Sequence, residues 1–119
     1  MSYPSEEIHE RARQYLQTHP ELINLDRNGQ HSLTSIVLSG EMSLLVPGGK
    51  TEIGRPDLVL FDQYGQLYIV ELQPTGGGKA RAKKQLTRSQ QHLQHYLRWN
   101  ATKLYVTGSP NRGFKTEII

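Results

Sequence analysis

Apolar residues near the start of the chain recur at the spacing of a helix that packs against a core. The stripe consists of Ile8, Ala12, Tyr15 and Leu16. Ser5 is the candidate N-cap, because a serine side chain can accept a hydrogen bond from the first free N–H groups. Pro20 cannot continue a helix. The pattern therefore predicts a first helix between these two residues.

Short apolar runs separated by turn-forming residues predict strands in the middle of the chain. The two clearest runs are Asp57–Asp62 and Leu67–Gln73. Weaker runs over Ser32–Ser39 and Met42–Val46 predict two earlier strands. Glycines at 76–78 end the predicted strand Leu67–Gln73.

The C-terminal third begins with a segment typical of a helix. Lys79–Trp99 contains no glycine or proline and is rich in residues that favour helices. Its expected apolar face consists of Ala82, Leu86, Leu93, Tyr96 and Leu97. Lys103–Thr107 predicts a strand, and Phe114–Ile119 an edge strand or tail. The order α-β-β-β-β-α-β predicts a single α/β domain over residues 1–119, with a central mixed sheet flanked by helices.

The segment between the two clear strands predicts a tight hairpin. Loop 63–65 has Gly65 at the position of a three-residue turn that needs positive φ. In that register Asp57 lies opposite Glu71, and alternation puts both carboxylates on one face. A two-residue loop would instead place Asp57 opposite Leu72.

Glu71 is unusual in an otherwise apolar strand, where it shares a face with Leu67 and Ile69. A buried carboxylate is costly unless it meets a cation, hydrogen-bond donors or a proton. Mg²⁺ takes one or two carboxylates, and it leaves its other positions to water and phosphate. The alternative is a salt bridge from Glu71 to Arg55 or to a lysine of the following helix.

Charge is divided unevenly along the 119 residues, whose net charge is +3. Five basic and ten acidic residues precede Pro74, whereas residues 74–116 hold nine basic residues and no acidic one. Such a stretch is a candidate surface for a polyanion. A solvated basic helix is the plainer interpretation.

Composition excludes several classes of protein. The absence of cysteine excludes a disulfide scaffold, a zinc finger and a thiol nucleophile. No apolar run approaches the ~18 residues of a membrane span, and the polar N-terminus lacks the apolar core of a signal peptide. We therefore expect a cytoplasmic protein without a membrane partner. A small core and the apolar end Ile118-Ile119 favour a homodimer.

A family resemblance emerges from the hairpin. Pro56-Asp57, thirteen intervening residues and Glu71-Leu72-Gln73 resemble the motif of the PD-(D/E)xK nuclease superfamily, in which lysine stands two positions after the Glu. Residues 52–55 and Gly65 resemble a segment of archaeal mismatch-type and related small nucleases. Gln85-Leu86 resembles the Gln-Leu of phage-exonuclease-type nucleases. The resemblance covers about residues 51–107 and implies a restriction-endonuclease-like fold.

The resemblance implies a metal centre for Mg²⁺ or Mn²⁺. Its ligands would be Asp57 and Glu71, with the Leu72 carbonyl as a third oxygen. A glutamate of the first helix often completes such sites, and Glu7 is the first choice and Glu6 the second. Both glutamates also suit a surface position in a first helical turn.

Gln73 stands where the family has lysine, so it could orient water or phosphate by hydrogen bonds but supplies no charge. The residues expected to bind nucleic acid are Arg55, Lys79, Arg81, Lys83, Lys84, Gln85 and Arg88. The resemblance thus implies a metal-dependent nuclease, and we expect nucleic acid as its substrate, with DNA favoured over RNA. The alternatives are a non-catalytic nucleic-acid-binding protein that keeps a degenerate nuclease fold, and an adaptor for an acidic partner.

His92 and His95 form a weaker motif, because histidines three residues apart on a helix could share a metal. No acidic residue lies near them in the sequence. A surface position or a phosphate contact is therefore the favoured interpretation.

Overall fold

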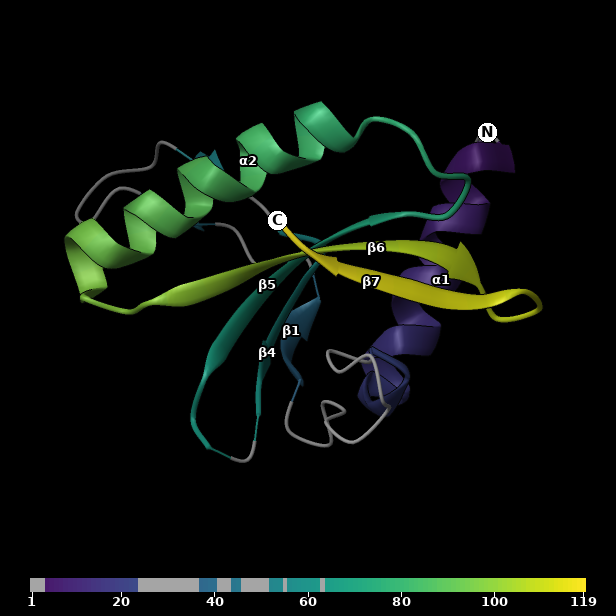
Figure 1. The fold of residues 1–119 in the computed structure, drawn as a ribbon, viewed down its shortest axis with the longest axis horizontal. Helices are drawn as coiled ribbons and strands as arrows, with labels where there is room; N and C mark the ends of the chain where they lie inside the picture. Colours follow the sequence, from purple (N-terminus) through teal and green to yellow (C-terminus); the bar gives the residue numbers. More distant parts are fainter. Residues whose placement is uncertain (1–3, 24–36, 41–43, 46–51, 55, 63) are drawn as a thin grey trace.

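The computed structural model describes residues 4–23, 37–40, 44–45, 52–54, 56–62 and 64–119 (Figure 1). The helical elements are α1 (Pro4–Thr18), η1 (Pro20–Leu22), α2 (Lys79–His92) and η2 (Leu93–Leu97). The strands are β1 (Val37–Gly40), β2 (Leu44–Leu45), β3 (Glu52–Gly54), β4 (Leu58–Phe61), β5 (Leu67–Gln73), β6 (Ala101–Ser109) and β7 (Gly113–Ile118).

Within these residues, five strands form a mixed sheet in the order β1-β4-β5-β6-β7. The central strand β5 is antiparallel to β4 and parallel to β6. Parallel neighbours need a crossover connection, and α2 provides it (Figure 1). Strands β2 and β3 pair with each other in a separate antiparallel ribbon. The predicted α/β class with a mixed sheet is confirmed.

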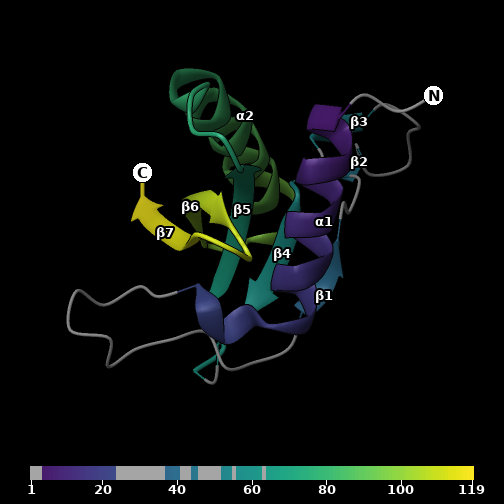
Figure 2. The ribbon, with the colours of Figure 1, turned by 90° about the vertical axis from the view of Figure 1, so that its right-hand side faces the viewer.

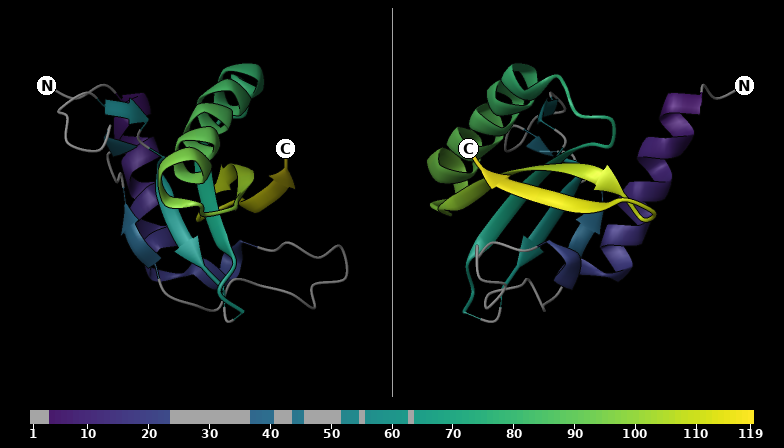
Figure 3. Two further views of the ribbon diagram at one scale, coloured as in Figure 1. Left: turned by 90° about the vertical axis from the view of Figure 1, so that its left-hand side faces the viewer. Right: turned by 45° about the vertical axis from the view of Figure 1, so that its right-hand side comes forward.

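The sheet lies between the two long helices (Figure 2). Ala12 and Leu16 of α1 are fully buried against one face of the sheet, and Leu86 of α2 and Leu93 of η2 are buried against the other. Alternation along β5 divides its side chains between these layers: Val70 and Leu72 face α1, whereas Leu67 and Ile69 face α2. The β4–β5 hairpin is thus covered by a helix on each side (Figure 3).

The predicted hairpin and its register are confirmed. Leu58 pairs with Val70 and Phe61 with Leu67, and Gly65 has a φ of +83°. Asp62 closes the turn, because its carboxylate accepts hydrogen bonds from the N–H groups of residues 64 and 66 at 2.8 and 2.9 Å. The same carboxylate accepts a third bond, of 2.8 Å, from the hydroxyl of Tyr68.

Helix α1 differs from the prediction at its start and in its buried face. It begins at Pro4, so Ser5 lies within the helix rather than at the N-cap; proline suits a first helical position. Ala12 and Leu16 are buried as expected, but Ile8 and Tyr15 are 45% and 39% exposed. The buried stripe is therefore narrower than the apolar pattern suggests.

The C-terminal end of the predicted long helix is also different. Regular α-helix ends at His92, and Leu93–Leu97 forms a π-helical turn. Such a turn has i→i+5 hydrogen bonds, so the residues after it are rotated relative to the α-helical face. Leu93 stays buried, but Tyr96 and Leu97 are exposed. His92, for which a surface position was favoured, is buried, and its ring centroid lies 4.8 Å from that of Tyr96.

The remaining strands are partly as predicted. Within the run over Met42–Val46, Leu44–Leu45 forms β2, and residues 42, 43 and 46 lie outside the described part of the chain. Strand β3 is a strand that the sequence analysis missed. Of the predicted strand Ser32–Ser39, residues 32–36 lie outside the described part of the chain. Strands β6 and β7 are confirmed, and β7 pairs with β6 at the edge of the sheet.

Candidate active site

The structure brings Asp57 and Glu71 together at one end of the β4–β5 hairpin. Asp57 directly precedes β4, and Glu71 belongs to β5. Each residue is only 8% exposed, and burial and then the charge of Asp57 raise the pKa of Glu71. A carboxyl pair of this kind can hold either a proton or a cation between its oxygens.

Asp57 does not continue the regular ladder, although the sequence places it directly opposite Glu71. Its N–H donates to the carbonyl of Val70 at 2.9 Å, while Leu58 is the ladder partner of Val70. Two successive residues thus oppose one residue of β5, as in a β-bulge. The Asp57 side chain in turn accepts a hydrogen bond of 2.7 Å from the N–H of Leu72.

The ionisation of Glu71 is strongly perturbed. Burial and then the nearby charge of Asp57 raise its pKa from 4.5 to about 8, and the Asp57 hydrogen bond acts in the same direction. The positive charge of Arg81 opposes the shift. At neutral pH Glu71 therefore keeps its proton, and a divalent cation would have to displace that proton to bind both carboxylates.

The side chain of α1 that contacts Asp57 is His9, which the sequence analysis missed. Its Nε2 lies 3.2 Å from Oδ2 of Asp57. The sequence held a signal for this contact, because residues 9, 12 and 16 share one face of the helix. Residues 12 and 16 of that face are buried. Glu7, the first choice for this role, is exposed.

Gln73 lies at the end of β5, beside the start of α2. A Cβ placed on Gly78, the N-cap of α2, would be 4.0 Å from Cδ of Gln73. No acidic residue occupies the first turn of α2, and no side chain caps it. The N-terminus of a helix favours anions, so a phosphate near Gln73 would meet a favourable field. The hydroxyl of Tyr105 donates to the carbonyl of Gly77 at 2.7 Å and anchors the connecting loop.

The carboxyl pair suits a cation that keeps several water ligands. Among the described residues there is no group of three or more His, Cys, Asp or Glu arranged to hold a metal. Mg²⁺ binds through one or two carboxylates plus water and phosphate, so Asp57 and Glu71 fit that donor set. Leu72, whose carbonyl the resemblance adds as a ligand, directly follows Glu71 and is fully buried.

The predicted nucleic-acid-binding residues of α2 are all exposed. They are Lys79, Arg81, Lys83, Lys84, Gln85 and Arg88. Arg81, Lys84 and Arg88 follow one side of the helix at spacings of three and four. Lys79 is engaged differently, because its Nζ forms an ion pair of 2.5 Å with Glu117 of β7. Arg55, also predicted for this surface, lies outside the described residues.

Comparison of the chain with protein-family models, with curated proteins and with solved structures gave no match. Across the described residues, every helix is too short or too polar to cross a membrane.

Proposed function

We propose that the protein is a metal-dependent nuclease of the restriction-endonuclease-like type, which hydrolyses phosphodiester bonds of nucleic acid, DNA in preference to RNA. The observation that carries the proposal is the buried pair of Asp57 and Glu71 beside a basic helix. Burial of two carboxylates without a cation costs free energy. Carboxyl groups that stay buried in spite of this cost are typical of functional sites.

In this proposal each residue has a distinct task. Asp57 and Glu71 hold Mg²⁺ or Mn²⁺, with the Leu72 carbonyl as a third oxygen ligand. When bound, the ion supplies an activated water and stabilises negative charge on the scissile phosphate. Gln73 orients the water or the phosphate by hydrogen bonds, and Arg81 brings positive charge to the same place.

Two features of the fold support this assignment. The hairpin that carries both carboxylates lies inside the sheet, with β1 and β6 on its outer edges. The N-terminus of α2 begins next to Gln73, so the basic helix leads away from the carboxyl pair. His9 belongs to α1, which packs on the other face of the sheet from α2. It contacts Asp57 and so fixes the orientation of that carboxylate.

The test is cleavage of supercoiled plasmid and of labelled oligonucleotides in Mn²⁺ or Mg²⁺. We expect nicking by the wild type, its loss in EDTA, and a decrease of at least about a hundredfold in Glu71→Ala, because a lost ligand typically costs several kcal/mol of transition-state stabilisation. The matched control is Glu21→Ala, which removes an exposed carboxylate elsewhere. Equal cleavage by the wild type and Glu71→Ala would overturn the proposal.

A second candidate is a nucleic-acid-binding protein without catalysis, which Gln73 favours because the charged residue of the family is missing there. This candidate predicts a gel shift of intact DNA that is independent of metal. An adaptor for an acidic protein would ignore DNA in both assays. The homodimer stays a prediction, and a sedimentation experiment at tens of micromolar tests it.

A further inference from the structure

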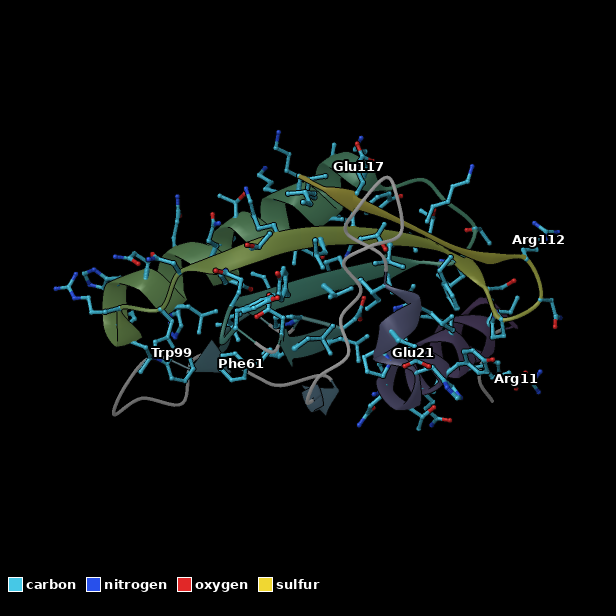
Figure 4. All side chains as sticks on the ribbon, turned by 60° about the horizontal axis from the view of Figure 1, so that its bottom comes forward. Arg11, Glu21, Phe61, Trp99, Arg112 and Glu117 are labelled. Atoms are coloured by element: carbon cyan, nitrogen blue, oxygen red, sulfur yellow. The ribbon has the colours of Figure 1, made fainter. Side chains whose placement is uncertain are left out.

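A pocket of about 480 Å³ opens at the end of the molecule where β5 leaves the sheet. Three segments that are distant in the sequence line it: α1, residues 74–75 after β5, and the turn between β6 and β7. Figure 4 labels Arg11 on α1 and Arg112 on that turn, and both lie at this end of the molecule. The volume is within the range of small-molecule and nucleotide sites.

The pocket is positively charged. Arg11 and Arg112 both line it and both are exposed, and within the described residues neither guanidinium has a carboxylate partner. Arg13, two positions further along α1, is different because its guanidinium is paired with Glu10. Glu7 lies one helical turn before Arg11 but does not line the pocket. Two unpaired guanidinium groups in one pocket favour a phosphate.

The other walls are partly apolar. Ile8, which the core leaves 45% exposed, lines the pocket together with Pro74 and Pro110. Thr75 and Asn111 add neutral hydrogen-bonding groups. Ser109 holds the turn in place, because its Oγ accepts the N–H of Arg112 at 3.2 Å. A phosphate joined to a sugar or base matches this mixture of charge and apolar surface.

The pocket lies close to the carboxyl pair, because one of its lining residues, Pro74, is near Glu71 in the sequence. Pro74 follows Glu71 by three residues, and an extended chain rises about 3.3 Å per residue, so the two lie within about 10 Å. Successive phosphates of one strand of duplex DNA advance about 3.4 Å along the axis. A strand bound at the carboxyl pair could therefore reach the pocket with a phosphate within about three nucleotides.

We propose that this pocket binds the sugar–phosphate backbone of the nucleic-acid strand within about three nucleotides of the bond that is cleaved. Arg11 and Arg112 contact the phosphate, and Ile8, Pro74 and Pro110 contact the sugar. The inference rests on the proposed function and extends it by giving the substrate strand a second contact. A neighbouring hollow that shares Pro74, Thr75 and Arg112 also includes Lys115, which continues the positive charge.

The test measures binding of a fluorescein-labelled single-stranded oligonucleotide by anisotropy, in EDTA so that no cleavage occurs. We expect Arg11→Gln with Arg112→Gln to weaken binding about tenfold at ~0.1 M salt. The slope of log K against log salt should become shallower by about 0.7, since both arginines contact one phosphate and each phosphate neutralised on a single strand contributes about 0.7. Arg13→Gln is the control, because it removes a charge from the same helix but one already paired with Glu10. The two single variants keep the test available if the double variant does not fold.

The outcomes separate the two proposals. If the wild type binds and the double variant loses both affinity and slope while Arg13→Gln does not, the inference is supported. If the double variant binds like the wild type, or if Arg13→Gln weakens binding equally, the pocket inference is overturned and the proposed function is unaffected. If the wild type binds no oligonucleotide, both fail. Equal cleavage by the wild type and Glu71→Ala would overturn the proposed function alone.

Discussion

Replacing Glu71 by glutamine isolates the effect of the proton that Glu71 shares with Asp57. Glutamine has nearly the same shape, and its NH₂ group can donate to the Asp57 carboxylate at every pH. In the wild type, that donor exists only while Glu71 is protonated. The variant should therefore keep the packing of the site and remove its dependence on pH.

The sign and size of the effect are set by the shifted pKa of Glu71, which rises from 4.5 to about 8 on folding. Between these values the folded protein holds one proton more than the unfolded chain. The free energy of unfolding therefore falls as pH rises, by up to about 1.4 kcal/mol per pH unit. Over the whole window the loss is on the order of 5 kcal/mol, and it levels off above about pH 8.

Urea denaturation in EDTA at pH values from about 5 to 9 measures this loss. We expect the wild type to lose stability across the range relative to Glu71→Gln, with similar stabilities near pH 5 and the largest difference near pH 9. The control Glu21→Gln, at an exposed carboxylate, should behave like the wild type. Added Mn²⁺ should recover much of the loss at high pH, because a cation replaces the missing proton. Parallel curves for the wild type and Glu71→Gln would refute this reasoning.

Three further predictions concern other parts of the molecule. Asp62→Ala should lower the free energy of unfolding by about 2–4 kcal/mol in urea titrations, because the hairpin turn and a buried tyrosine hydroxyl lose their acceptor; a change below about 0.5 kcal/mol would contradict it. Gly108→Ala should cost at least about 2 kcal/mol in thermal melts, since its φ is +116° and a Cβ would lie 2.0 Å from the carbonyl oxygen of Gly113; an unchanged melting temperature would contradict it. Lys83→Glu with Lys84→Glu should weaken DNA binding and flatten its salt slope from roughly −4 or −5 by about 2, with an unchanged circular dichroism spectrum; an unaltered slope would exclude these lysines from the interface.

The sequence was most informative where structure is local. The hairpin needs only a glycine with positive φ at Gly65 and two strands with period-two alternation, so its register could be predicted and the carboxyl pair with it. The bulge at Asp57 could not be predicted. Pro56 has no N–H to donate to the ladder, and the carboxylate of Asp57 accepts the hydrogen bond from the N–H of Leu72. That substitution of side chain for main chain depends on three-dimensional geometry.

The errors arise where tertiary contacts decide. The apolar pattern of the sequence predicted that Ile8 lies on the buried face of α1. The sheet instead covers the face that carries His9, Ala12 and Leu16. The π-helical turn after His92 ends a segment whose composition favours a regular helix throughout. The pocket at Arg11 combines three segments separated by more than 30 residues each, so no local pattern could reveal it.

The parallel pairing of β5 with β6 has a consequence during synthesis of the chain. The β4–β5 hairpin can form as soon as its residues leave the ribosome, but seven of its residues pair with β6 only after residues 74–100 have been made. At usual elongation rates this takes roughly one to five seconds. During that time β5 presents an apolar, hydrogen-bonding edge of the kind that templates aggregation. The lysines and arginines of α2 are the next residues to emerge, and their charge keeps nascent chains apart until β6 closes that edge.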